Sequence, residues 1–180
     1  MKKTQNPSAL RSRKEIFESL LKLMHEYPYS KITVKQIIMG TSLVGKTFYL
    51  NFSSKDDALY SIIDEKIMAY IKDVSDSDDP ISVIFEFCDM NSEFLLLLHK
   101  NKLLYLLLLR LNEVIPECNV TLDLSNNPFS KLFGDLNPDY LIAFNIGAIW
   151  NVIFKWVDRG MVDSLDTVKM TINQYLRRIY

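Results

Sequence analysis

The chain has 180 residues and 48% hydrophobic content, which suits one or two small domains and excludes disorder over most of its length. Five Gly and six Pro, among runs rich in Leu, Ile, Lys, Glu and Asp, favour long helices over an all-β fold. The net charge of −1 is unevenly spread: ten Lys/Arg and three Asp/Glu give residues 1–55 a charge of +7, and eleven against nineteen leave −8 for residues 56–180. A basic N-terminal third suits a phosphate-rich partner, with a solvated basic face as the alternative.

The predicted elements are all helices, so we expect an all-α protein. In chain order they span residues 11–24, 34–39, 45–51, 54–74, 80–98, 102–116, 138–160 and 164–178. Apolar residues recur at helical spacing in the longer segments, and Thr33, Ser54 and Ser164 stand where N-caps are expected. Residues 119–127 are polar and turn-prone. We predict a three-helix domain over residues 1–55, joined by the fourth helix to a helical domain over residues 56–180.

Cysteines, histidines and apolar runs give no sign of a metal, cofactor, disulfide or membrane site. Cys88 and Cys118 form no C-x-x-C motif and fit a reducing compartment. His25 and His99 are too isolated to indicate a catalytic triad or a metal cluster. The densest apolar run, from Phe94 onward, is interrupted by HKNK before it reaches the roughly 18 to 20 residues of a membrane span. We expect a cytoplasmic protein without enzyme activity or a cofactor.

The stretch ITVKQIIMGTSLVGKTFYLNFSSKDDAL, which begins at Ile32, fits two incompatible patterns. Gly40, Gly45, Lys46 and Thr47 fill every fixed place of the phosphate-loop pattern G-x-x-x-x-G-K-[ST], which predicts a nucleotide-binding enzyme. That loop follows a buried strand in a parallel sheet, and the residues before Gly40 have a composition that a strand could adopt. No alternation of strands and helices follows, and no apolar run ends in an aspartate that could hold magnesium.

Two short helices joined by a turn are the second interpretation of the same stretch. It places Lys46, Thr47, Tyr49 and Asn51 on a helix that could enter a groove of DNA, while Phe48 points into the core. The second interpretation predicts a transcription regulator.

Two segments of this stretch, TVKQI and TFYLNFSSKDDAL, resemble the signature of tetracycline-repressor-like (TetR family) regulators. The second segment is the more specific. Its helix ends in T-[aromatic or Leu]-Y-x-x-F and is followed by S-K and an acidic pair. This pattern combines a phosphate contact, a core anchor and a helix cap. The resemblance covers about residues 10–60. The C-terminal part, with Trp150, Trp156 and Arg159-Gly160-Met161, is similar to some short members of the family.

The resemblance implies that double-stranded DNA is the partner and that this stretch binds it. The predicted DNA-binding residues are Lys35, Gly45, Lys46, Thr47, Tyr49, Asn51 and Lys55. Thr47 and Tyr49 would bond phosphates through their hydroxyls, and Lys55 would neutralise another phosphate. The family's base-reading positions fall on Lys35, Gly45 and Lys46. Because Gly45 has no side chain, Lys46 is expected to reach O6 or N7 of guanine.

The turn departs from the family pattern at two positions. Ser42 stands where a glycine is usual, and Val44 stands where a Ser or Thr usually caps the next helix. A valine side chain cannot accept the N–H bond, which costs about 1 kcal/mol in typical helices, so we expect Ser42 to cap the helix one turn early. The alternative hypothesis is a TetR-like interaction protein that has lost operator binding.

The last two helices are predicted to pair with a second copy, because helix-turn-helix proteins bind two half-sites as dimers. The predicted interface residues form one apolar stripe on each helix: Ile142, Ile146, Ile149 and Ile153 on the first, and Val168, Ile172 and Tyr175 on the second. Packing of these stripes within their own subunit is the alternative.

The middle helices carry aromatic and polar residues that could line an apolar pocket for a small-molecule effector. The predicted lining residues are Phe85, Cys88, Phe94, Tyr105 and Arg110, with ordinary core packing as the alternative. The resemblance implies that an effector shifts the spacing of two DNA-reading heads through the fourth helix. The favoured hypothesis is a dimeric, ligand-responsive transcription regulator.

Overall fold

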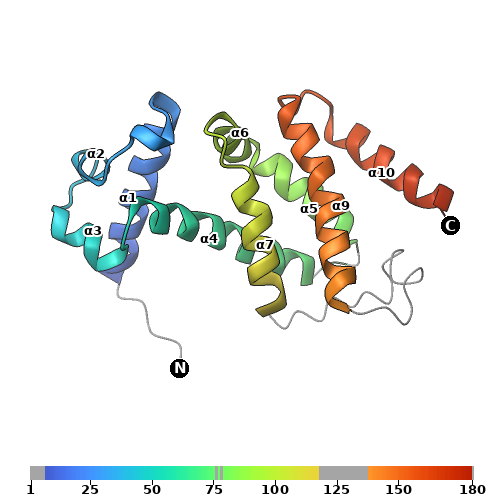
Figure 1. Ribbon diagram of the computed structural model, residues 1–180, viewed down its shortest axis with the longest axis horizontal. Coiled ribbons are helices and arrows are strands. Elements are labelled where there is room, and N and C mark those ends of the chain that lie inside the picture. The colour runs from blue at the N-terminus through green and yellow to red at the C-terminus, as the bar shows by residue number, and fades with distance from the viewer. Residues whose placement is uncertain (1–6, 76, 78, 118–137, 180) are drawn as a thin grey trace. The chain divides into compact units, whose positions relative to one another are not determined.

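The computed structural model describes residues 7–75, 77, 79–117 and 138–179, and every regular element among them is a helix (Figure 1). The elements are α1 (Pro7–Glu26), the short 3-10 helix η1 (Tyr29–Lys31), α2 (Val34–Met39), α3 (Gly45–Asn51), α4 (Lys55–Ser75), α5 (Pro80–Met90), α6 (Ser92–Lys100), α7 (Tyr105–Glu117), α9 (Pro138–Asp158) and α10 (Leu165–Ile179). The prediction of an all-α fold is confirmed. The chain divides within α4 into two compact units, Met1–Glu65 and Lys66–Tyr180.

The first unit is built on α1, which packs against both α2 and α3 (Figure 1). Ile16, Leu20 and Met24 follow one another at intervals of four along α1 and are fully buried. Ile37 from α2 and Phe48 from α3 are also fully buried. Removing each such side chain from water contributes about 1.5–3 kcal/mol, so this apolar stripe holds the two short helices on α1.

Side-chain caps fix where the short helices begin. Thr33 caps α2 with a reciprocal pair of bonds: its Oγ1 accepts from the Gln36 N–H at 3.3 Å, and Gln36 Oε1 accepts from the Thr33 N–H at 2.9 Å. Ser54 Oγ accepts from the Asp57 N–H at 3.0 Å and so caps α4. The predicted caps at Thr33 and Ser54 are therefore present, but Asp57 reaches back to the N–H of Ser53, at 2.7 Å, instead of that of Ser54.

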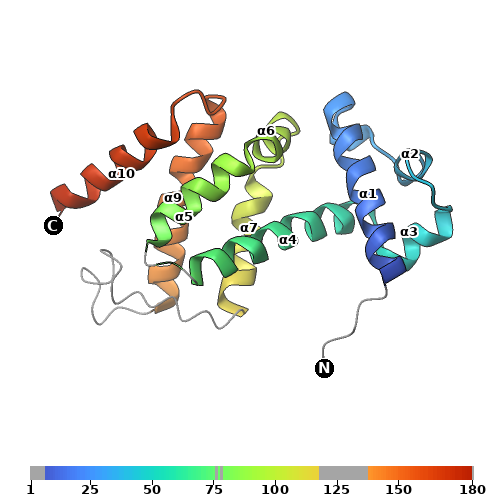
Figure 2. The ribbon, with the colours of Figure 1, turned by 180° about the vertical axis from the view of Figure 1, so that it is seen from behind.

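The second unit is a helical bundle. In it α9 packs against α6 and α7, and α5 packs against α6 and α10 (Figure 2). Phe85, Leu98, Leu111 and Ile153 are fully buried at its centre. The connection from α9 to α10 begins at Gly160, whose φ of 74° lies in the left-handed region that glycine adopts without a steric cost.

The helix predicted over residues 80–98 is two helices in the structure. Asn91 separates α5 from α6 with φ −107° and ψ 20°, and its side-chain amide donates to the Phe87 carbonyl at 2.8 Å. Lys66 Nζ in turn donates to Asn91 Oδ1 at 2.5 Å. Asn112 and Asn151 make the same bond to the carbonyl four residues back within α7 and α9, so this bond does not account for the break, and periodicity alone does not detect it. The start predicted at residue 102 was also too early, since Lys102 has a φ of 60° and α7 begins at Tyr105.

Within the described ranges, no helix combines the length and the apolar character that crossing a bilayer requires. Cys88 is a buried free thiol, and burial raises its pKa above the ordinary value. Cys118 and the polar segment 119–127 lie outside the described residues.

Candidate nucleic-acid interface

Side-chain hydrogen bonds hold the turn between α2 and α3, some from within the turn and some from α1. Thr41 Oγ1 donates to the Ile38 carbonyl at 2.8 Å and accepts from the Leu43 N–H at 3.2 Å. The Ser42 N–H and hydroxyl both donate to Oε2 of Glu15 on α1, at 3.0 and 2.8 Å. The turn is therefore fixed to α1 as well as to itself.

Ser42 does not cap α3, so that prediction was wrong. The Ser42 hydroxyl donates to Glu15 instead. Val44 is the N-cap residue of α3, and it makes no side-chain cap bond. The first intrahelical bond of α3 is instead a backbone one, from the Thr47 N–H to the Val44 carbonyl at 2.8 Å. The helix therefore keeps its start at Gly45 without a polar cap.

A second contact fixes α2 close to α1. Ser19 Oγ donates to the Ile37 carbonyl at 2.7 Å in a buried position. A Cβ added at Gly40 would lie 2.4 Å from that same Oγ, so a larger residue at the end of α2 would have to displace the Ser19 side chain. Together these contacts set the spacing of the two short helices from α1.

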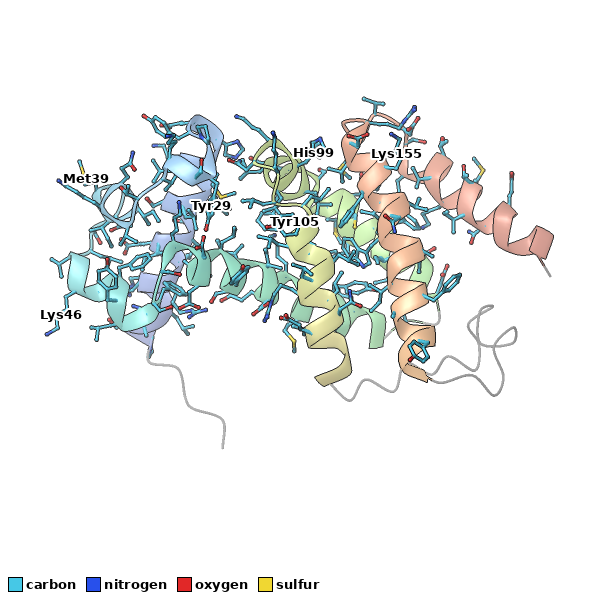
Figure 3. All side chains as sticks on the ribbon, viewed as in Figure 1. Tyr29, Met39, Lys46, His99, Tyr105 and Lys155 are labelled. Atoms are coloured by element: carbon cyan, nitrogen blue, oxygen red, sulfur yellow. The ribbon has the colours of Figure 1, made fainter. Side chains whose placement is uncertain are left out.

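Four of the predicted DNA-binding residues lie on the surface formed by α2 and α3. Lys35 is exposed on α2, and Lys46 projects outward from the start of α3 (Figure 3). In the described part of the chain neither lysine takes part in a salt bridge. Tyr49 is 64% exposed, and a Cβ at Gly45 would meet nothing within 4 Å. This surface offers two ammonium groups, a phenol and an open stretch of backbone.

The other three predicted DNA-binding residues are partly engaged inside the unit. Thr47 and Asn51 are half-buried, and the Asn51 amide donates to the Thr47 carbonyl at 2.8 Å. Lys55 Nζ donates to the carbonyls of Tyr29 and Ile32, at 2.7 and 2.8 Å. Two of the three N–H donors of this ammonium are thus used, which leaves one for a phosphate. Lys55 ties the start of α4 to η1.

Tyr29 also contributes to the connection between η1 and the start of α4. The Lys55 ammonium lies 4.5 Å from the centroid of the Tyr29 ring, and the Tyr29 hydroxyl donates to Asp56 Oδ1 at 2.5 Å. Burial, together with the bond to Asp56, raises the pKa of the Tyr29 phenol. The hydroxyl therefore remains a donor throughout the neutral range.

Sequence reasoning missed Glu15, Ser19 and Arg13, all on α1. Arg13 lies over the rings of Phe17 and Phe52, 5.4 and 4.8 Å from their centroids, and pairs with Glu65 at 3.2 Å. For Ser19 a signal existed, since a small polar residue interrupts the apolar stripe of α1. For Glu15 there was none, because a glutamate on an amphipathic helix is ordinary.

Large apolar side chains are also exposed on this surface. Met39, Val44 and Leu50 are 76%, 68% and 75% exposed, and Met39 projects from the end of α2 (Figure 3). Apolar groups of this kind can contact the methyl group of thymine or another protein. These side chains carry no hydrogen-bond donor and no charge, so they do not bind phosphate.

The phosphate-loop interpretation is contradicted by the residues that precede Gly40. They form α2, whereas a phosphate loop needs a strand there. Among the residues that the structure describes there is no strand from which a parallel sheet could be built.

The predicted pocket residues divide between core and surface. Phe85 and Cys88 are fully buried and Phe94 is 7% exposed, whereas Tyr105 is 55% exposed. Arg110 pairs with Glu113 one turn along α7. Core packing accounts for the first three residues, and an effector pocket stays a prediction.

Burial corrects part of the predicted dimer interface. Ile146, Ile153 and Val168 are 8%, 0% and 9% exposed in the single chain, so they pack within their own subunit. Ile149 and Ile172 are half-buried. The side chains of the two remaining predicted residues, Ile142 and Tyr175, lie outside the described part of the chain.

No family model and no curated protein matches this sequence. Among solved structures, the fold is similar to that of the fatty acid degradation regulator FadR from Bacillus halodurans. The TM-score is 0.66 over 97% of this chain and 96% of that chain, at 16% sequence identity. The two chains share an all-helical fold over nearly their whole length.

Proposed function

We propose that this protein is a TetR-type transcription regulator that binds operator DNA through α2 and α3. The observation that carries the proposal is the α2–turn–α3 unit, fixed to α1 by Ser19 and Glu15, with Lys35, Lys46 and Tyr49 exposed on it. The similarity to a structure described as a regulator supports the same class.

Contacts to phosphate and contacts to bases are assigned to different residues. Thr47 and Tyr49 would bind phosphates through their hydroxyls and so set the position of the protein on DNA. Lys46 and Lys35 would read base edges in the major groove, with guanine O6 and N7 as the acceptors for Lys46. We assign Lys55 mainly to positioning α4, because two backbone carbonyls already accept from its ammonium.

A second copy of the chain would cover the outer faces of α9 and α10. Tyr140 and Phe144, one turn apart on α9, are 78% and 55% exposed, and Met170 on α10 is 56% exposed. Large apolar groups of this kind are typical of interfaces between subunits. A two-fold pair would present two copies of α3 to the two halves of a palindromic operator. We further propose an unidentified small-molecule effector bound in the second unit.

A second candidate function is an interaction protein that has lost operator binding. The exposed apolar side chains Met39, Val44 and Leu50 favour it, because they surround the surface at which DNA would bind. The two candidates differ in salt dependence: binding to DNA releases counterions and weakens steeply with salt, and apolar binding to a protein does not.

The experiment that tests the proposal is a mobility-shift titration of the full chain against the DNA flanking its own gene, with unrelated duplex as competitor. Retained, salt-sensitive complexes with the flanking DNA support the regulator. Absent binding, or binding that does not respond to salt, favours the second candidate.

A further inference from the structure

We propose that Glu15 is the positioning residue of the DNA-reading helix, which it holds in place through Ser42; this inference rests on the function proposed above. Glu15 Oε2 accepts the backbone N–H of Ser42 at 3.0 Å and the Ser42 hydroxyl at 2.8 Å. Glu15 lies within α1, a helix of 20 residues, while Ser42 lies in the turn between α2 and α3. The two bonds therefore attach the turn to a long helix.

The start of α3 needs such an attachment. This helix has seven residues and begins at Gly45, and its N-cap residue Val44 makes no side-chain cap bond. Short helices are marginal on their own, and the N–H groups at an uncapped start lack partners within the helix. Glu15 fixes the chain two residues before the cap position, and thus restrains the direction in which α3 begins.

The bonds made by Ser42 differ from the others in the turn. The Thr41 N–H donates to the Ile38 carbonyl at 3.0 Å, and the Leu43 N–H donates to Thr41 Oγ1 at 3.2 Å. Both of these are local and would persist if the turn moved as a body. The bonds from Ser42 to Glu15 join the turn to α1, so they fix the place of the turn as well as its shape.

Ionised Glu15 suits this role at neutral pH. The backbone and side-chain hydrogen bonds from Ser42 lower the pKa of the carboxyl group. The carboxylate can therefore accept both bonds wherever the protein is folded and the pH is near neutral.

If α3 is misplaced, sequence-specific binding and non-specific binding to DNA should change differently. The base contacts of Lys46 depend on where the helix lies, whereas attraction between the basic unit and the DNA backbone does not. Loss of the Glu15 contact should therefore lower the preference for a chosen sequence while leaving binding to random DNA intact. Simple unfolding of the unit would lower both.

The test compares Glu15→Ala with Glu15→Gln, which removes the same charge but keeps an oxygen that can accept from Ser42. Glu18→Ala is the matched control, because Glu18 is exposed on the same helix and pairs with Lys14 at 3.8 Å. Ser42→Ala serves as a second variant, which loses the hydroxyl bond and keeps the N–H bond.

Wild-type full chain first selects a duplex from a random library. Dissociation constants for that duplex and for a shuffled duplex of equal length are then measured at one salt concentration by fluorescence anisotropy. The ratio of the two constants is the sequence preference of each variant.

We expect Glu15→Ala, which removes both bonds from Ser42, to reduce this preference by about tenfold or more, since one lost hydrogen bond to a charged group already has an effect of about this size. Ser42→Ala should reduce it less, and Glu15→Gln and Glu18→Ala should stay within about twofold of wild type. Preference unchanged in Glu15→Ala, or lost equally in all three Glu variants, overturns the inference and leaves the proposed function standing. If wild-type chain selects no duplex, the proposed function fails, and this inference fails with it.

Discussion

The hydroxyl of Ser19 donates a buried 2.7 Å hydrogen bond to the carbonyl of Ile37, and thereby joins α1 to α2. Gly40 makes room for this bond, because a Cβ there would lie 2.4 Å from Ser19 Oγ. The spacing between α1 and α2 thus depends on two small residues, Ser19 and Gly40.

Gly40→Ala should destabilise the first unit by about 1–3 kcal/mol, since the added methyl group breaks the Ser19 bond or forces the helices apart. Hydrogen exchange of amides in α1 and α2 measures the loss. Both tryptophans, Trp150 and Trp156, lie in the second unit, so their fluorescence provides an internal control that should not change.

Combining Gly40→Ala with Ser19→Ala should cost less than the sum of the single changes, because the second substitution removes the atom that clashes. If the losses of stability from the two substitutions were strictly additive, the effect of Gly40→Ala would not arise from a clash with Ser19.

Lys55→Met should lower the stability of the first unit by about 1–2 kcal/mol, because the carbonyls of Tyr29 and Ile32 lose their donor. Lys31→Met, at an exposed lysine of η1, is the charge-matched control. In DNA titrations at several salt concentrations, Lys55→Met should leave the slope of affinity against salt unchanged. A slope reduced by about one unit would identify Lys55 as a phosphate ligand.

Trp156→Phe should destabilise the second unit by about 1 kcal/mol beyond the loss of ring volume, because its indole N–H donates to the Asp163 carbonyl at 2.9 Å. Trp150→Phe removes the same volume from another buried position and serves as the control. In each variant the remaining tryptophan reports denaturant unfolding. Equal losses of stability in the two variants would show that the bond to Asp163 makes no net contribution to stability.

Phe144→Glu should weaken self-association by about tenfold or more in sedimentation equilibrium, because it places a charge on the apolar outer face of α9. Leu109→Glu, at a similarly exposed position on α7, is the control and should leave the association constant unchanged. A wild-type chain that stays monomeric at high micromolar concentration would contradict the proposed pairing of α9 and α10.

Local signals in the sequence predicted most of the helices. Thr33, Ser54 and Ser164 mark helix starts that the structure confirms, because capping depends on residues only a few positions apart. The break at Asn91 escaped prediction because it does not disturb the apolar periodicity.

The contacts that build the candidate site were harder to predict. The bonds of Glu15 to Ser42 and of Lys55 to η1 join residues that are distant in the sequence, and nothing local marks their partners. The burial of Ile146, Ile153 and Val168 within a single subunit was missed for a related reason. Apolar periodicity shows that a helix has a buried face, but it does not show whether Ile153 is buried by its own subunit or by another.

Salt-dependent titration of a selected duplex tests whether α3 carries the contacts to operator DNA. Affinities of wild-type chain, the double variant Lys46→Ala/Tyr49→Ala and the charge control Lys22→Ala are compared by fluorescence anisotropy. We expect wild-type affinity to fall steeply as salt rises, and the double variant to lose about 2–4 kcal/mol of specific binding with a shallower slope. Lys22→Ala should retain sequence preference. Binding by the double variant that equals wild type in strength and in salt dependence would show that α3 does not carry these contacts.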